Sequence, residues 1–415
     1  MDFNDTPEEA AFRSEVRSWL EANAELKTPD DTGSDVLAER TSPQVVKHAQ
    51  SWQKKKADAG WACLTWPKEY GGRDASSIQS VIWGQEESKF KTAAPIFGIG
   101  LGMCGPTILT HGTEEQKQRW IPKMITGEEI WCQLFSEPAA GSDLAGLRST
   151  AVKDGDDWIV NGQKIWTTGA HFCDWGILVV RSDPHAAKHA GLSYFVVDMH
   201  SPGIEIRPIT QINGGTGFNE VFFTDVRIPD ANRLSEVGNG WAVAITTLMN
   251  ERSSIGSGGT GGGVSDLLAL AEKLEIDGSP AIEDSGVREQ IADFYTRSKG
   301  LQYTGMRSLS ALSQGKTPGP EASMGKLVGA FLAQEVAAFG MELAGTAAGT
   351  HDAEFTPAAA EWQDRYLGIP GLRIAGGTDE VLRNIIAERV LGLPPEARAD
   401  KGIPFKDIPT GPPSK

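Results

Sequence analysis

A single glutamate stands near the end of a helical run that is otherwise mostly apolar. The run WAVAITTLMNER places Glu251 one turn after Thr247 and Leu248, and Arg252 follows it directly. A carboxylate is a natural base for taking a proton from carbon, and burial on an apolar helix would raise its pKa toward the working pH. The same pattern fits two solvated polar residues at a helix C-terminus. Glu251 is therefore either a candidate base or an ordinary solvated residue at the end of a helix.

A second candidate region lies between Gln133 and Ala170. A polar segment with several glycines is followed by an alternating strand that ends in Trp166, Thr167 and Thr168. A flavin ring needs an aromatic or apolar surface to lie on, with NH and OH donors near its N1, O2 and N5 atoms. Trp166 and Thr168 supply these groups, but Trp and Thr are also common in ordinary strands. Alone, they do not separate a cofactor site from a structural strand.

The composition excludes several classes of protein. The 415 residues are 40% hydrophobic and 23% charged, as in ordinary globular chains. The formal net charge of −16 and the pI near 5.0 argue against nucleic-acid binding. No stretch approaches the roughly 20 uninterrupted apolar residues of a membrane span. The acidic start MDFNDTPEEA lacks the features of a secretory signal, so the sequence predicts a cytoplasmic protein.

The cysteines and histidines predict no metal site. Four isolated cysteines without a C-x-x-C pair are typical of reduced thiols: Cys63, Cys104, Cys132 and Cys173. His185 and His189 are four residues apart, but the Pro and Gly around them indicate a loop.

The periodicity of apolar residues divides the chain into four parts. Residues 1–130 read as helices, starting with a capping box at Thr6. Residues 131–233 change to a strand-like period with turn residues between the runs. The helical pattern returns over 234–395, and 396–415 form a Pro- and Lys-rich tail that we expect to be mobile or draped on a neighbour. The predicted fold class is α+β, in the order helical, β, helical.

Three glycine-rich segments invite comparison with nucleotide-binding loops or cofactor sites. Gly100–Gly105 matches G-x-G-x-x-G but has no convincing strand before it, so we expect close helix packing there. Gly315-Lys316-Thr317 lacks the first glycine of a phosphate-binding loop. Residues 256–263, GSGGTGGG, predict either a flexible turn or room for a bulky group.

Five segments, in order, resemble the acyl-CoA dehydrogenase family. They are WPKEYGG, GPTILTHGTEEQKQRWIPKMITGE, SEPAAGSD, NGQKIWTT and GGTDEVLRNIIAERVLG, and together they extend over nearly the whole chain. The resemblance implies an N-terminal helical domain, a middle β-barrel-like domain and a C-terminal four-helix bundle. It also implies FAD as cofactor, an acyl-CoA thioester as substrate and electron-transfer flavoprotein as the electron acceptor.

The resemblance also assigns residues, position by position. The cofactor contacts that it implies are Gln133, Phe135, Ser136, Trp166, Thr168, Thr378 and Glu380. The substrate contacts are Ser142, Arg252, Gly376 and Gly377, with the Gly376 backbone NH as a donor to the thioester carbonyl. Ser142 also fits a simple turn residue. Gly376 stands where the family usually has its catalytic glutamate, whereas Glu251 matches the position used in long-chain and isovaleryl types. The resemblance therefore favours Glu251 as the base, with Arg252 ordering the substrate or the base.

A second departure concerns the partner of this chain. The family's R-x-x-F-G segment, whose Arg reaches the flavin pyrophosphate of a neighbouring subunit, is missing from LALAEKLEIDGSPAIEDSGVREQ. Arg288 is a weak substitute, because it reads as an exposed residue at a helix start. The sequence is thus compatible with a homodimer or homotetramer, or with a hetero-oligomer in which a different subunit completes the FAD site.

The predicted reaction is FAD-dependent α,β-dehydrogenation of an acyl-CoA to a trans-2-enoyl-CoA. The position of the base and the glycines after it hint at a branched, long or polycyclic acyl group. A flavin oxidase or monooxygenase on the same fold is one alternative, since the sequence does not predict whether the reduced flavin reacts with oxygen. A non-catalytic partner subunit is the other, favoured by Gly376 and the missing R-x-x-F-G segment and opposed by Glu251.

Overall fold

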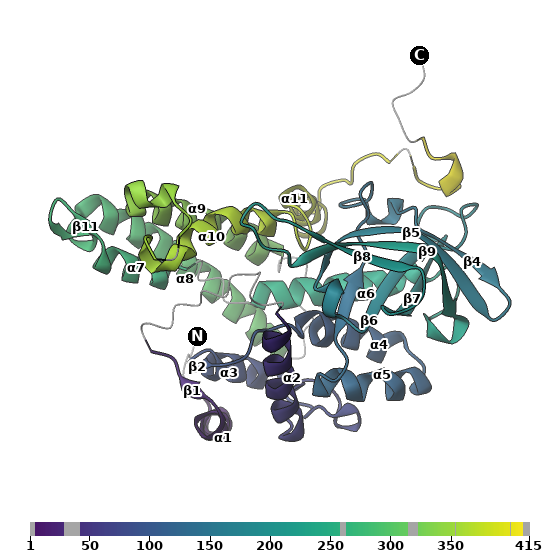
Figure 1. The fold of residues 1–415 in the computed structure, drawn as a ribbon, viewed down its shortest axis with the longest axis horizontal. Helices are drawn as coiled ribbons and strands as arrows, with labels where there is room; N and C mark the ends of the chain where they lie inside the picture. The colour runs from purple at the N-terminus through teal and green to yellow at the C-terminus, as the bar shows by residue number, and fades with distance from the viewer. Residues whose placement is uncertain are drawn as a thin grey trace, which may run out of the picture.

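A computed structural model describes residues 5–28, 42–257, 263–313, 323–352, 354–398 and 400–409. The side chains at 252–257 are outside the description, and so are residues 258–262 of the glycine-rich segment and Gly315-Lys316-Thr317. Helical parts stand at both ends of the chain and a sheet lies between them in sequence (Figure 1). The predicted α+β class and the order helical, β, helical are confirmed.

The N-terminal part is helical. Its helices are α1 (Pro7–Asn23), α2 (Pro43–Asp58), α3 (Ser77–Glu87), α4 (Gly105–His111) and α5 (Glu114–Thr126), with a short strand pair, β1 (Glu25–Leu26) and β2 (Phe90–Lys91). The capping box predicted at Thr6 is present, because Thr6 and Glu9 bond each other's backbone NH groups. Tryptophans fill the space between α1 and α3, where the rings of Trp61 and Trp83 stack at 5.0 Å.

The glycines of Gly100–Gly105 serve packing, as predicted. They lie in a turn of π-helix over Gly100–Cys104 that leads into α4. A Cβ on Gly105 would stand 2.1 Å from the Trp66 ring, and one on Gly100 would stand 3.4 Å from Trp131. Only glycine lets the helix approach the Trp66 ring this closely.

A buried carboxylate joins α1 to α3. Glu86 has no exposed side-chain surface and bonds Arg13 at 3.1 Å, Arg17 at 3.0 Å and Lys89 at 2.9 Å. Burial opposes the charge on Glu86, but hydrogen bonds from Arg17, Lys89 and Arg13 outweigh it and lower its pKa to about 2. The folded-state pKa lies below the unfolded one, so the stabilisation is complete above the unfolded pKa and is lost as the pH falls toward 2.

This carboxylate predicts a measurable acid sensitivity. Between about pH 5 and about pH 2, the N-terminal part should lose roughly 2 kcal/mol of unfolding free energy through Glu86, after allowing for screening of its half-exposed partners. Urea denaturation of the wild type and of Glu86→Gln at several pH values measures the difference. The gap between the two proteins should close as the pH falls, whereas the exposed Glu8→Gln control should follow the wild type. A gap that is independent of pH would contradict the assignment.

The middle part is an eight-stranded sheet, seen at the right of Figure 1. Its strands are β3 (Trp131–Leu134), β4 (Thr150–Asp154), β5 (Asp157–Thr168), β6 (Trp175–Arg181), β7 (Leu192–Asp198), β8 (Ile204–Ile209), β9 (Phe218–Pro229) and β10 (Arg233–Leu234). The order is β10-β7-β6-β4-β5-β9-β8, with β3 added parallel to β6. The long antiparallel pair β5–β9 shifts register twice, between Val160 and Gly162 and between Lys164 and Thr167.

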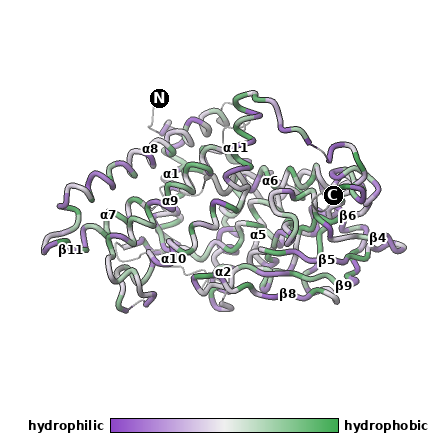
Figure 2. The backbone as a smooth tube through the Cα atoms, turned by 90° about the horizontal axis from the view of Figure 1, so that it is seen from above, coloured by the Kyte–Doolittle hydropathy of each residue, from purple (hydrophilic) through white to green (hydrophobic). Residues whose placement is uncertain are grey.

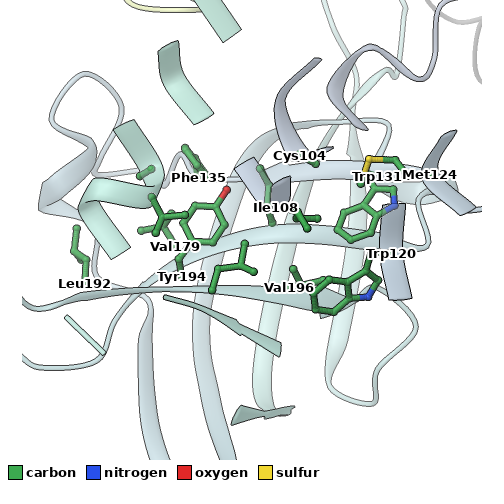
Figure 3. Close-up of a cluster of buried hydrophobic side chains, with 14 of the residues drawn as sticks. Cys104, Ile108, Trp120, Met124, Trp131, Phe135, Val179, Leu192, Tyr194 and Val196 are labelled. Carbon is green, nitrogen blue, oxygen red and sulfur yellow. The ribbon is translucent and has the colours of Figure 1, made fainter. Parts of the chain in front are cut away.

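One face of the sheet packs on the N-terminal helices and on α6 (Gly240–Ser257). The shared core contains Trp120 and Trp131 at one end and Phe135 and Tyr194 at the other (Figure 3). Val243 and Ala244 bring α6 into the same cluster. This helix therefore begins its course fixed against both preceding parts of the chain.

The C-terminal part is helical again. Besides α6 it contains α7 (Val264–Lys273), α8 (Ser285–Ser313), α9 (Ser323–Ala344), α10 (Glu361–Gly368) and α11 (Asp379–Ile385), with a small hairpin of β11 (Glu275–Ile276) and β12 (Ser279–Pro280). Figures 1 and 2 place α7, α8 and α9 at the end of the molecule away from the sheet, with α6 and α11 between the two. Within the described residues, one helix, 323–349, is long and apolar enough to cross a membrane. Its Leu332 and Val336 belong to the core shared with α7, α8 and Trp362 of α10.

Candidate active site

The candidate base Glu251 meets a candidate cofactor residue from another part of the chain. The Gln133 side chain donates from Nε2 to Oε2 of Glu251 over 3.3 Å, although 118 residues separate them in sequence. Gln133 is the third residue of β3, and both residues are partly buried. Glu251 is thus a partly buried carboxylate where the sheet meets the C-terminal helices, and it is not a freely solvated residue at a helix end.

A cluster of buried hydroxyls fixes α6 one turn before Glu251. The Oγ1 atom of Thr247 lies 2.9 Å from Thr107 Oγ1 of α4 and 2.9 Å from Tyr194 Oη of β7. All three residues are buried, and they come from the three parts of the chain. Hydrogen bonds between buried groups are costly to break, because the groups left behind lose both water and partner. The cluster therefore sets the position of α6 relative to the sheet.

Trp166 has an unusual backbone and an exposed ring. Its φ is 62°, a left-handed conformation that is strained for a bulky side chain, and 56% of the residue is exposed. Alternation from the buried Trp158 and Val160 would turn Trp166 inward, but the irregular pairing between Lys164 and Thr167 turns it out. Its ring meets Phe218 edge-on at 6.1 Å. The strained backbone at Trp166 thus turns an aromatic ring toward the surface.

The neighbours of Trp166 supply polar groups. Thr168, two residues on, is also exposed, and the partly buried Ser136 accepts a backbone hydrogen bond from Ile165 at 2.9 Å. The end of β5 and the end of β3 are thereby joined. An exposed aromatic surface next to hydroxyl donors is the donor set that an isoalloxazine ring requires, so these residues fit a flavin.

The ring of Phe135 does not share this surface. It is 4% exposed and packs edge-on against Tyr194 at 5.9 Å, inside the core drawn in Figure 3. A contact between Phe135 and a ligand at the end of β3 would therefore come from the backbone rather than from the ring.

A buried ion pair fixes the same strand ends. Lys164 is fully buried, and its Nζ lies 2.7 Å from Oε1 of Glu137 and 3.1 Å from the carbonyl oxygen of Phe135. Glu137 also accepts backbone hydrogen bonds from Arg148 at 2.6 Å and Ser149 at 3.0 Å. Burial disfavours the charge on Glu137, but the Lys164 ammonium and these donors more than compensate and lower its pKa. The pair closes the base of the loop over residues 137–149.

This ion pair was not predicted from the sequence, although the sequence contains a signal for it. Lys164 is at an inward position of an alternating strand, counted from Trp158 and Val160. A lysine at such a position requires a buried partner. No local pattern identifies the partner as Glu137.

A second buried lysine, Lys326, holds the Gly376-Gly377 turn, and the sequence did not predict this contact. Both glycines have positive φ, 64° and 97°, so a side chain at either position would be strained. Lys326 of α9 is buried and donates to the Gly377 carbonyl over 2.7 Å. Desolvation lowers the pKa of Lys326 despite the nearby Asp379 carboxylate.

Thr378 and Glu380 lie at the start of α11, which packs on α9. Thr378 is the N-cap and accepts from the Val381 NH at 3.2 Å, and Glu380 is exposed in the first turn. Ser142 is exposed on the 137–149 loop, and the side chain of Arg252 is outside the description. The structure thus joins Gln133 to Glu251 and Ser136 to the Trp166 strand, whereas Thr378 and Glu380 belong to a separate element.

Comparisons with known proteins agree with this architecture. Three family models match in order: Acyl-CoA dehydrogenase, N-terminal domain over residues 6–128, the middle domain over 132–226 and the C-terminal domain over 238–391. The chain is 36% identical over 402 residues to the acyl-CoA dehydrogenase IpdE1 of Mycobacterium tuberculosis, covering 93% of this chain and 98% of that one.

Two solved structures are also similar. The Tcur3481-Tcur3483 steroid ACAD is 26% identical with a TM-score of 0.82, and the match covers 95% of this chain and 100% of that chain. The ChsE4-ChsE5 complex from Mycobacterium tuberculosis is 30% identical with a TM-score of 0.78, again over 95% and 100%. With three matching domain models over most of its length and a relative of 36% identity, this chain belongs to the acyl-CoA dehydrogenase family.

Proposed function

We propose that this acyl-CoA dehydrogenase uses FAD to convert an acyl-CoA into its trans-2-enoyl-CoA, with Glu251 as the base. The observation that carries the proposal is the hydrogen bond from Gln133 to Glu251, because it links a residue of the family's flavin segment to a carboxylate of the C-terminal helices. The proposed domain boundaries are 130, 233 and 395, and the proposed location is the cytoplasm.

In this proposal, the residues of the site divide the chemistry between them. Glu251 takes the proton from the α carbon on a carboxylate oxygen, and Gln133 holds that carboxylate in place. A flavin held at this site would supply the acceptor for the β hydrogen, which leaves as a hydride. The Gly376 NH donates to the thioester carbonyl, which acidifies the α carbon and stabilises the charge that develops on oxygen. Trp166 and Thr168 would hold the flavin ring. Gln133, Ser136 and the Phe135 backbone would contact its pyrimidine side, and Thr378 and Glu380 would contact the other end of the cofactor.

The contacts of the CoA portion follow from the resemblance. Ser142 would meet the pantetheine or thioester end, Arg252 would order the substrate or the base, and Gly377 would contact the substrate. Electrons would pass to electron-transfer flavoprotein, as the family assignment implies. We propose a polycyclic, steroid-derived acyl group as the first substrate class to test, because one similar solved structure is described as a steroid ACAD.

A non-identical partner subunit is the second element of the proposal. Both similar solved structures carry the names of two components, Tcur3481-Tcur3483 and ChsE4-ChsE5. The missing R-x-x-F-G arginine gives a partner a physical task, since a cation is required where the cofactor pyrophosphate lies. A homodimer or homotetramer is the simpler assembly, and the mass of the purified protein with and without candidate partners separates the two.

An anaerobic absorbance titration tests the proposed function. The purified chain, loaded with FAD, is titrated with short, long, branched and steroid acyl-CoA thioesters. Bleaching of the flavin band by one class supports dehydrogenation and identifies the acyl group. Flavin that binds but is never reduced, in the presence of the partner subunit as well, would overturn it. Rapid reoxidation by air after bleaching would favour the oxidase alternative.

Trp166 provides a prediction that separates binding from folding. Trp166→Ala removes the exposed ring, so we expect the FAD affinity to fall about tenfold, the equivalent of one good aromatic contact. The apoprotein should unfold at nearly the same temperature, because the ring is mostly exposed. Fluorescence titration with FAD and a thermal melt measure the two effects. Trp158→Ala is the contrasting control. The Trp158 ring is buried, so the melting temperature of this variant should be lower than that of the wild type.

A further inference from the structure

The C-terminal segment packs on the middle domain of its own chain. Figure 1 shows the segment, coloured yellow, leaving α11 and running over the sheet domain. The NH groups of Phe405 and Lys406 donate to the carbonyls of Ala186 and Pro184 at 2.9 and 3.0 Å, and Pro404 forms a bridge with Ala187. Residues 404–406 therefore pack against the loop between β6 and β7, and the predicted tail has a partner within the chain.

A buried lysine connects this segment to the 137–149 loop. Lys188, itself 8% exposed, lies 2.7 Å from Asp400 of the tail and 2.7 Å from Asp143, the neighbour of Ser142. One ammonium thus joins the C-terminal segment to the loop that carries the candidate CoA contact. Arg398 adds a second cation on Asp400, at 3.0 Å.

The second connection runs through Arg181. This residue is 2% exposed, and its guanidinium donates to the carbonyls of Ala145, Leu147 and Lys188 at 2.6, 3.3 and 3.0 Å. The Phe405 ring lies over the same guanidinium, 3.3 Å from ring centroid to Cζ. The ring covers a charge that would otherwise face solvent, and a cation over an aromatic face is stabilised more when water is excluded.

Both connections end on the loop whose two ends are joined by Glu137, which pairs with Lys164 and accepts from the NH groups of Arg148 and Ser149. The loop contains Ser142 and a single turn of 3-10 helix over Leu144–Gly146. The loop has little regular structure, so its conformation depends on the groups that bind its carbonyl oxygens and Asp143. The C-terminal segment supplies a partner for two of these groups: Asp400 for Lys188 and the Phe405 ring for Arg181.

We propose that residues 400–409 form a strap that fixes the 137–149 loop in the conformation that receives the CoA thioester, with Arg181, Lys188 and Phe405 as positioning residues. The proposal rests on the proposed function, because it takes Ser142 as a CoA contact. It predicts that a released strap weakens acyl-CoA binding while leaving the flavin and the base untouched.

The test uses the full-length FAD-loaded protein and the double variant Asp400→Asn/Phe405→Ala. Hydrogen exchange of the peptide that covers residues 140–149 should accelerate about tenfold, because local opening becomes easier. The KM for the acyl-CoA that bleaches the wild type should rise about fivefold, the equivalent of the lost cation–π contact, with kcat and FAD content unchanged. Asp407→Asn, an exposed carboxylate in the same segment, should match the wild type in every readout.

Each outcome decides the proposal. Unchanged exchange in the loop would overturn the strap, and faster exchange with an unchanged KM would overturn its role in CoA binding. If the double variant does not fold, Asp400→Asn alone, which keeps the Phe405 ring, provides the same two readouts with smaller changes. Failure of the wild type to be bleached by any thioester would count against the proposed function, whereas the exchange experiment would still decide whether the strap holds the loop.

Discussion

Glu251→Gln should abolish turnover while FAD remains bound. The amide keeps the shape of the side chain but cannot accept the α proton, so kcat should fall by about 10²–10⁴-fold, the usual contribution of a positioned general base. Gln133 then faces an amide instead of a carboxylate, and a neutral hydrogen bond between the two remains possible. Steady-state turnover with an artificial electron acceptor and the absorbance of bound flavin measure the two quantities.

The controls for this experiment separate chemistry from structure. Glu272→Gln changes an exposed carboxylate on α7 and should leave kcat at the wild-type value. Gln133→Leu removes the donor to Glu251 and should reduce kcat less than Glu251→Gln does, since the base itself remains. Turnover by Glu251→Gln at the wild-type rate would exclude Glu251 as the base and would revive the interpretation of this chain as a partner subunit.

Lys164→Met should cost about 3–5 kcal/mol of unfolding free energy, because it leaves the buried Glu137 carboxylate without its cation. Lys164 also holds the Phe135 carbonyl, so the end of β3 should loosen and the FAD affinity should fall with stability. Urea denaturation at pH 7, followed by tryptophan fluorescence, gives the free energy, and flavin fluorescence gives the affinity.

The double variant Lys164→Met/Glu137→Leu is the decisive companion. It removes both charges, so it should be more stable than Lys164→Met alone. The backbone NH groups of Arg148 and Ser149 lose their acceptor in the double variant, which prevents complete recovery. A double variant as unstable as the sum of the two single variants would show that the pair is not coupled. Lys153→Met, a partly exposed lysine of the same sheet, should change the free energy by less than about 1 kcal/mol.

Much of the fold was predictable from local patterns. The capping box at Thr6 and the change from helical to strand-like periodicity at about residue 131 depend on neighbours in the sequence, so they are visible without the tertiary structure. The close packing at Gly105 was predicted because no strand preceded it. The five ordered segments added the family, and the matching domain models confirm it.

Other features escaped because they depend on contacts between distant elements. Strict alternation along β5 would bury Trp166, and only the irregular pairing with β9 turns its ring outward. Lys326 reads as an ordinary helical lysine until α9 is placed against the Gly376-Gly377 turn. The tail reads as a mobile or intermolecular segment until Phe405 is placed over Arg181.

The sequence by itself determined the order of the three parts and the resemblance to the family, and it offered Glu251 as the candidate base. Only the tertiary structure decided that Glu251 lies against Gln133, and that the loop with Ser142 is held between a buried ion pair and the C-terminal segment. The physical reason is that secondary structure follows from interactions within a few residues, whereas burial and partner choice follow from packing between elements that lie far apart in sequence, here by 27 to 212 residues.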